Sequence, residues 1–132
     1  MTCYKWVNDY VGIPYLANGR GDEVDCYGLV IKVMQEQHGV EMPQWSVDKY
    51  SRTSADQLLS DKAHESINNK LLTQVFTPKD FNIVLVYRFT QCLHIGVVIN
   101  GGVLHAHSKY VVWESRNRFK AKHGNVRFYK WH

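Results

Sequence analysis

Two groups of residues in the 132-residue sequence could carry chemistry: a cysteine that follows a glycine loop, and three closely spaced histidines. Cys26 follows the loop at 18–22 and comes directly after Asp25, a residue type that often caps a helix N-terminus. A thiol at that position faces the positive end of the helix dipole, where thiolate is favoured over thiol. The placement is typical of a nucleophile, although free cysteines are also common as small buried core residues.

The histidines fall in a predicted β-hairpin. Asn100-Gly101 separates two apolar runs, 92–99 and 102–107, and this dipeptide is a strong signal for a two-residue turn. Because strand side chains alternate between faces, one face of the hairpin is wholly apolar in that register. The other face carries three histidines and a glycine that leaves room for a close-packed helix end: His94, His105, His107 and Gly96.

Spacing alone leaves three interpretations of this histidine face open. In the first, His94 is the general base for Cys26, and His105 or His107 orients it. In the second, Cys92 with His94 and His105 with His107 form a metal site, since period-two spacing places each pair on one face. In the third, the histidines are polar side chains on a solvated face. Catalysis also accounts for the cysteine and its loop, which the metal site does not.

The elements that must position these residues indicate a mixed α and β domain. The helix that begins at Cys26 carries apolar residues on the same side as the thiol and ends at Gly39. A short helix is predicted within 2–11, and a second begins at a capping box, Ser54 to Gln57, and runs to about Ile67. Strands are predicted at 83–87, 92–99, 102–107, 111–113 and 126–129.

Length and composition fit one domain over 1–132, with 45% hydrophobic and 21% charged residues. The net charge is +4, and the excess lies within 116–130, where it could contact phosphate or an acidic polymer or simply face solvent. Three cysteines argue against a disulfide framework. We find no secretion signal and no membrane-spanning stretch, and we expect synthesis in the cytoplasm, no membrane insertion and no nucleic-acid partner.

Taken in order, these residues resemble the NlpC/p60 family of cysteine peptidases. The G-x-P-Y segment of the family matches Gly12-Ile13-Pro14-Tyr15, and its D-C-x-G-L-V nucleophile motif matches Asp25 to Val30. The strand before the histidine matches Ile83-Val84-Leu85, and the H-V-G-I motif matches His94-Ile95-Gly96-Val97. The segment of the third catalytic residue matches Leu104-His105-Ala106. The resemblance leaves 41–75 uncovered. It implies an α+β, papain-like fold in which the nucleophile helix packs on a central antiparallel sheet.

The resemblance also implies the activity, hydrolysis of amide bonds in peptidoglycan stem peptides without a cofactor or metal. Cys26 would be the nucleophile, His94 the base and His105 the residue that orients the base. The spacing from His94 to His105 is one residue shorter than in the family, so His107 stays an alternative third residue. Tyr15 would line the site and help to hold the oxyanion with the Cys26 backbone N–H.

Two further positions bear on the substrate. Asp25 would contact a substrate amine, and Tyr27 stands where the family commonly has a small serine. Tyr27 is similar to the phage tail-associated branch, as are the segments Tyr87-Arg88 and Arg127-Phe128-Tyr129-Lys130. We therefore expect a virion tail or tail-tip component that contacts other tail-tip proteins and acts at the host cell wall. The alternative is a structural tail or assembly protein that has the fold without turnover.

Overall fold

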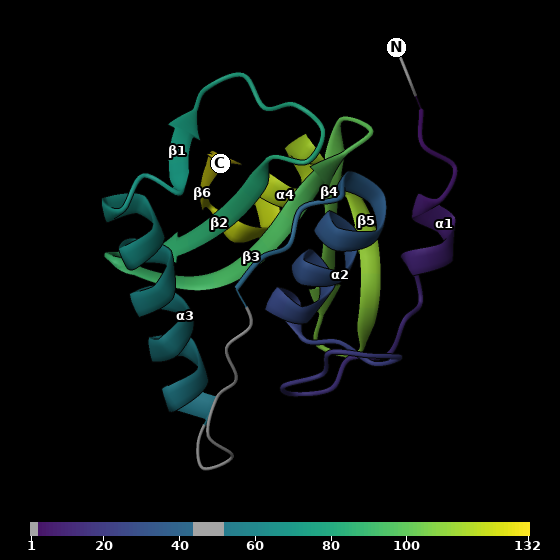
Figure 1. The fold of residues 1–132 in the computed structure, drawn as a ribbon, viewed down its shortest axis with the longest axis horizontal. Coiled ribbons are helices and arrows are strands. Elements are labelled where there is room, and N and C mark those ends of the chain that lie inside the picture. The colour runs from purple at the N-terminus through teal and green to yellow at the C-terminus, as the bar shows by residue number, and fades with distance from the viewer. Residues whose placement is uncertain (1–2, 44–51) are drawn as a thin grey trace.

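The computed structural model describes residues 3–43 and 52–132 (Figure 1). The helices are α1 (Val7–Tyr10), α2 (Cys26–His38), α3 (Arg52–Asn68) and α4 (Arg116–His123). The strands are β1 (Leu72–Val75), β2 (Ile83–Arg88), β3 (Gln91–Ile99), β4 (Gly102–His107), β5 (Tyr110–Ser115) and β6 (Asn125–Trp131). They form one antiparallel sheet in the order β1-β6-β2-β3-β4-β5, and α2 packs on β3 and β4. The predicted α+β class is confirmed.

The helix that begins at Cys26 has the predicted boundaries. The Asp25 carboxylate caps it by accepting a hydrogen bond from the Gly28 backbone N–H at 2.6 Å. Gly39 closes it in the left-handed region, with φ of 68°. None of the helices in the described part of the chain is long and apolar enough to cross a membrane.

The β3–β4 hairpin turns at the predicted dipeptide. Asn100 and Gly101 have φ of 54° and 73°, as a turn with two left-handed central residues requires. The registered pairs are Ile99↔Gly102, Val98↔Val103 and Val97↔Leu104. The predicted register is therefore confirmed over these three pairs, and the registered ladder with β4 extends no further along β3 than Val97.

The two faces of the sheet bury different sets of side chains. The helix-side core joins α1, α2 and α3 to one face and includes Val30, Val33, Leu85, Ile95, Val97, Leu104 and Ala106. The α4-side core is smaller and lies on the other face: Val84, Val86, Val98, Val103, Phe119 and Phe128. Figure 1 shows α2 and α4 on opposite sides of the sheet.

Several element predictions were wrong in detail. The first helix covers only Val7–Tyr10, because the Tyr4 backbone N–H and C=O bond the Asn100 side chain at the hairpin turn. The helix α3 begins at Arg52, two residues before the predicted cap at Ser54. No strand was predicted at β1. The α4 segment was predicted only as part of a basic run, because Phe119 is its one buried residue.

Candidate active site

The Cys26 thiol lies beside Ile95, two residues beyond Val97↔Leu104, the last registered pair of β3 and β4. Along β3, the N–H of Val98 points toward β2, since it donates to Asn82 O. Successive residues of a strand point their N–H groups to opposite sides, so the N–H of Ile95 points toward β4. This N–H bonds the Cys26 sulfur. The first residue of α2 thus reaches β3 from the helix side, just beyond the registered β3–β4 pairs.

The resting thiol is protonated. Burial raises the pKa of Cys26 to about 12, and the nearby Asp25 carboxylate adds to the rise, while hydrogen bonds from the Ile95 and Tyr27 backbones oppose it. The thiolate predicted from the helix dipole is therefore not the resting state, since burial is the largest cause of the shift in pKa. Across the described residues, no hydrogen bond joins Cys26 to His94.

His94, His105 and Glu114 form a continuous chain of hydrogen bonds on the face of the sheet that α4 covers. His94 Nε2 lies 2.9 Å from His105 Nδ1, and His105 Nε2 lies 3.0 Å from a Glu114 carboxylate oxygen. The second oxygen of Glu114 accepts a 2.5 Å hydrogen bond from Lys122 Nζ. His105 is almost fully buried, so its ring has no alternative partner in solvent.

The charge on Glu114 fixes where the protons lie along this chain. Although burial raises its pKa, hydrogen bonds from Lys122 and His105 lower the pKa of Glu114 below the usual value, and the carboxylate is ionised and can only accept. Burial lowers the pKa of His94 to about 3 and that of His105 to about 4, so both imidazoles are neutral at neutral pH. His105 must then donate from Nε2 and accept at Nδ1. His94 donates from Nε2 and keeps the lone pair on Nδ1, which is free to act as a base.

Helix α4 covers this chain and supplies residues that sequence reasoning missed. The Phe119 ring centroid lies 4.8 Å from that of His105, and the His123 ring stacks on His94 at 5.8 Å with an interplanar angle of 23°. Glu114 was missed as well. An available signal was strand alternation, since Glu114 pairs with Val103 and so shares a face with His105.

No protein-family model matches the sequence, and no curated protein matches it. Among solved structures, the chain is similar to the NlpC/p60 domain of the peptidoglycan hydrolase SagA, with a TM-score of 0.60 and 18% sequence identity. The alignment covers 96% of this chain and 92% of that chain. The chain has the NlpC/p60 fold.

One prediction about how this fold positions its site was wrong. We expected the Cys26 helix to pack on the histidine face, with Gly96 making room for it. Instead α2 packs on the apolar face, because its own buried stripe is apolar, and α4 covers the histidines. A Cβ on Gly96 would lie 3.1 Å from the His105 Cβ, so this glycine makes room for β4 rather than for a helix.

The alternative third residue and two substrate-binding candidates lie as follows. His107 is exposed, and its ring centroid lies 5.7 Å from that of His105. The Asp25 carboxylate bonds Arg20 Nη1 at 2.7 Å in addition to capping α2. Tyr15 is partly exposed, and its segment pairs with Val24, just before the cysteine.

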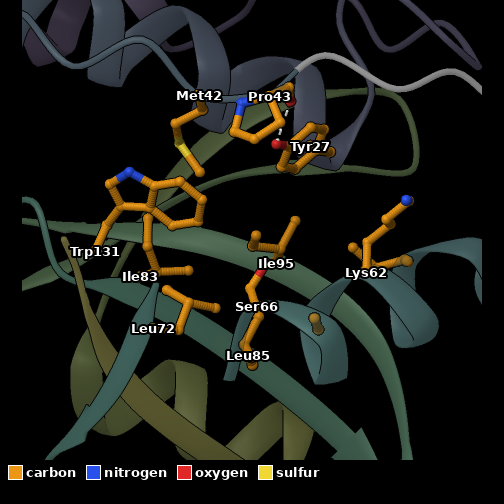
Figure 2. A pocket seen from close by; sticks show the side chains of 12 residues that line it. Tyr27, Met42, Pro43, Lys62, Ser66, Leu72, Ile83, Leu85, Ile95 and Trp131 are labelled. Carbon is orange, nitrogen blue, oxygen red and sulfur yellow. Dashed lines mark hydrogen bonds between the residues drawn. The ribbon is translucent and has the colours of Figure 1, made fainter. Parts of the chain in front are cut away.

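Tyr27 points away from the histidines into the helix-side core. Its ring is buried, and its hydroxyl donates a 2.5 Å hydrogen bond to Pro43 O, as Figure 2 shows. The apolar cavity beside it measures about 30 Å³, close to the volume of one water molecule. A larger cavity, about 550 Å³, lies beside Met34 and His38 at the opposite end of α2 from Cys26.

The metal site considered from spacing does not assemble as expected. The pairs Val86↔His94 and Tyr87↔Cys92 skip one residue of β3, so an irregularity interrupts the alternation between Cys92 and His94. Cys92 packs in the helix-side core, on the face opposite the histidines. The prediction that Cys92 and His94 share a face was wrong because the strand is bulged between them.

Proposed function

We propose that the protein is a cysteine hydrolase that cleaves amide bonds in peptidoglycan stem peptides. The observation that carries the proposal is the chain from Glu114 through His105 to His94, which leaves a neutral, correctly protonated base next to the residue that bonds the Cys26 thiol. The fold adds support, because a domain of a peptidoglycan hydrolase shares it.

In the proposed mechanism, His94 takes the proton of Cys26 in the same step in which the sulfur attacks an electrophile. As the sulfur attacks the amide carbon, His94 Nδ1 takes the thiol proton and the carbonyl electrons move to oxygen. The C–N bond then breaks, and His94 returns the proton to the leaving amine. A water molecule, deprotonated by His94, attacks the thioester, releasing a carboxylic acid and restoring the thiol. A raised thiol pKa suits this order, since no thiolate has to exist beforehand.

The oxyanion would be held at the start of α2. The Cys26 backbone N–H belongs to the first helical turn, whose N–H groups have no partner within the helix. It is therefore available to a developing negative charge, and the helix dipole favours charge there. Tyr15, on the segment that pairs with Val24, is the proposed second contact.

The direct test compares the wild type with Cys26→Ala on purified peptidoglycan, with released peptides identified by mass spectrometry. We expect release by the wild type and a loss of several orders of magnitude in the variant. Cys3→Ala is the matched control, because Cys3 is an exposed thiol and should be dispensable. Equal release by the wild type and Cys26→Ala would refute the mechanism.

A second candidate is a structural tail or assembly protein that has the fold without turnover. The absence of a hydrogen bond between Cys26 and His94, both in the described part of the chain, favours it. Iodoacetamide labelling of Cys26 separates the two candidates. Labelling at neutral pH that slows in His94→Gln indicates a working base. Labelling that needs alkaline pH and is unchanged in His94→Gln indicates the structural protein.

The proposed setting is a phage tail or tail tip, where the protein would act on the host cell wall together with other tail-tip proteins. The support is the resemblance at Tyr27, Tyr87-Arg88 and the segment 127–130. Two of these positions touch, since the Arg127 guanidinium lies 4.3 Å from the Tyr87 ring centroid. Mass spectrometry of purified virions tests the setting: the proposal requires the chain among the tail proteins and fails if the virions lack it.

A further inference from the structure

We propose that His105, Glu114 and His123 bind a divalent zinc-class metal ion, and that this ion inhibits the hydrolase. One ligand atom from each residue lies within 4.8 Å of the other two. Two imidazoles and one carboxylate are a common donor set for zinc, and they leave a fourth position for water. The binding site stands on geometry alone, whereas the inhibition rests on the proposed function.

The three ligands come from three elements that already pack together. His105 lies on β4, Glu114 on β5 and His123 at the end of α4. Phe119 holds the α4 ligand in place, with its ring centroid 4.3 Å from that of His123. Contacts of this kind fix ligand positions before an ion arrives, which reduces the ordering that binding requires.

The His123 ring carries an independent sign of a missing ligand. Its Nε2 atom is buried and has no hydrogen-bond partner in the described part of the chain. Buried polar atoms are nearly always paired, and one that is not calls for an explanation such as an absent ion. A bound ion would give this nitrogen a partner.

Binding requires two small movements. Ligands placed about 2.0–2.2 Å from zinc in a tetrahedron lie roughly 3.4 Å apart. His105 Nε2 and the Glu114 oxygen, 3.0 Å apart, are already near that separation, so it is the His123 nitrogen that must close in, by up to about 1.4 Å. Lys122 must also release the Glu114 oxygen, because its ammonium would repel the ion. Its side chain is 46% exposed and can turn into solvent. The charge on Lys122 therefore opposes the ion, and its removal should strengthen binding.

The ion would act on catalysis through the proton positions in the histidine chain. It takes the place of the proton on His105 Nε2, and that proton moves to Nδ1. His105 then donates to His94 Nε2, so the proton of His94 must sit on Nδ1. Each imidazole keeps one proton and only its position changes. His94 Nδ1 can then no longer accept the proton of Cys26, and the base is blocked.

Calorimetric titration of Zn²⁺ into Cys26→Ala protein tests the site without any contribution from the nucleophile. We expect one ion per chain, at least tenfold weaker binding in Cys26→Ala/His123→Phe, and tighter binding in Cys26→Ala/Lys122→Met. Phenylalanine preserves the ring packing, and a melting curve confirms folding. Absence of binding, or equal affinity in the His123→Phe protein, would overturn the site.

Two further measurements complete the test. Co²⁺ bound to Cys26→Ala should give a spectrum without a sulfur-to-metal charge-transfer band, and such a band would overturn the ligand set. In otherwise wild-type enzyme, Zn²⁺ should inhibit peptide release with the affinity found by calorimetry, and His123→Phe should weaken inhibition by the same factor. Binding without inhibition would overturn the link to the base. A lack of any activity in metal-free enzyme would instead refute the proposed hydrolase and leave the binding result standing.

Discussion

The two faces of the central sheet use the same strands for opposite purposes. On the helix side, Ile95 and Leu104 belong to a continuous apolar core against α2. On the α4 side, the neighbouring residues His94 and His105 are enclosed with Glu114 in a chain of hydrogen bonds. Apolar burial stabilises a fold, whereas buried polar groups cost free energy unless they are fully paired. The apolar core on the helix side therefore stabilises the fold, and that fold holds the hydrogen-bonded residues of the α4 side in place.

Cys26 connects the two faces. It begins α2 on the helix side, and the N–H of Ile95 on β3 bonds its sulfur just beyond the registered β3–β4 pairs. The registered β3–β4 pairs run from Ile99↔Gly102 to Val97↔Leu104 and end short of Ile95. The end of the registered pairs is thus where a nucleophile from one face meets the strand that carries the base of the other.

The largest expected effect comes from removing the base. His94→Gln places an amide nitrogen near the position of Nε2 and can keep the bond to His105, but it has no basic nitrogen. We expect kcat/KM for peptide release to fall by about 10²–10⁴-fold, with little change in melting temperature. Unchanged activity would show that the histidine face is not the catalytic one.

The opposite pattern is expected on the helix side. Leu104 is fully buried in the helix-side core, one residue from His105, and Leu104→Ala should lower the free energy of unfolding by about 2–5 kcal/mol. Below its melting temperature, the variant should retain kcat. Urea unfolding measures the first effect and peptide release the second. A near-neutral stability change would contradict the division of roles between the faces.

Acid should destabilise the protein through the histidine face. The folded pKa values of His94 and His105, about 3 and 4, lie below the ordinary value of 6.5. Between these limits the unfolded chain binds more protons, so stability falls as the pH falls. From pH 7 to pH 5, each histidine should cost about 2 kcal/mol of unfolding free energy. Urea titrations at both pH values measure this loss. In His94→Gln, the loss of unfolding free energy between pH 7 and pH 5 should be smaller by the contribution of one histidine.

The sequence predicts the helix-side face of the sheet better than the face that α4 covers. The apolar periodicity of α2 predicted that Cys26 lies on a helix. The Asn100-Gly101 turn predicted that the three histidines share one face of the β3–β4 hairpin. The identity of the covering helix could not be predicted, because α4 is largely cationic and buries mainly Phe119. The bulge that moves Cys92 to the other face leaves no sequence pattern, since it depends on pairing with β2.

Glu114 was not predicted from the sequence as a site residue. Its substitution should have the smallest effect on activity. Glu114→Gln keeps the size and one acceptor oxygen but removes the charge that fixes the proton on His105 Nε2. The amide can also donate, which allows the reversed proton arrangement in which His94 cannot act as a base. We expect kcat/KM to fall by about 10–100-fold, mainly through kcat, and its pH profile to shift. Glu114→Asp, which keeps the charge on a shorter side chain, should recover part of the loss. If both variants lose activity equally and without a shift in the profile, Glu114 acts through packing rather than through the histidine chain.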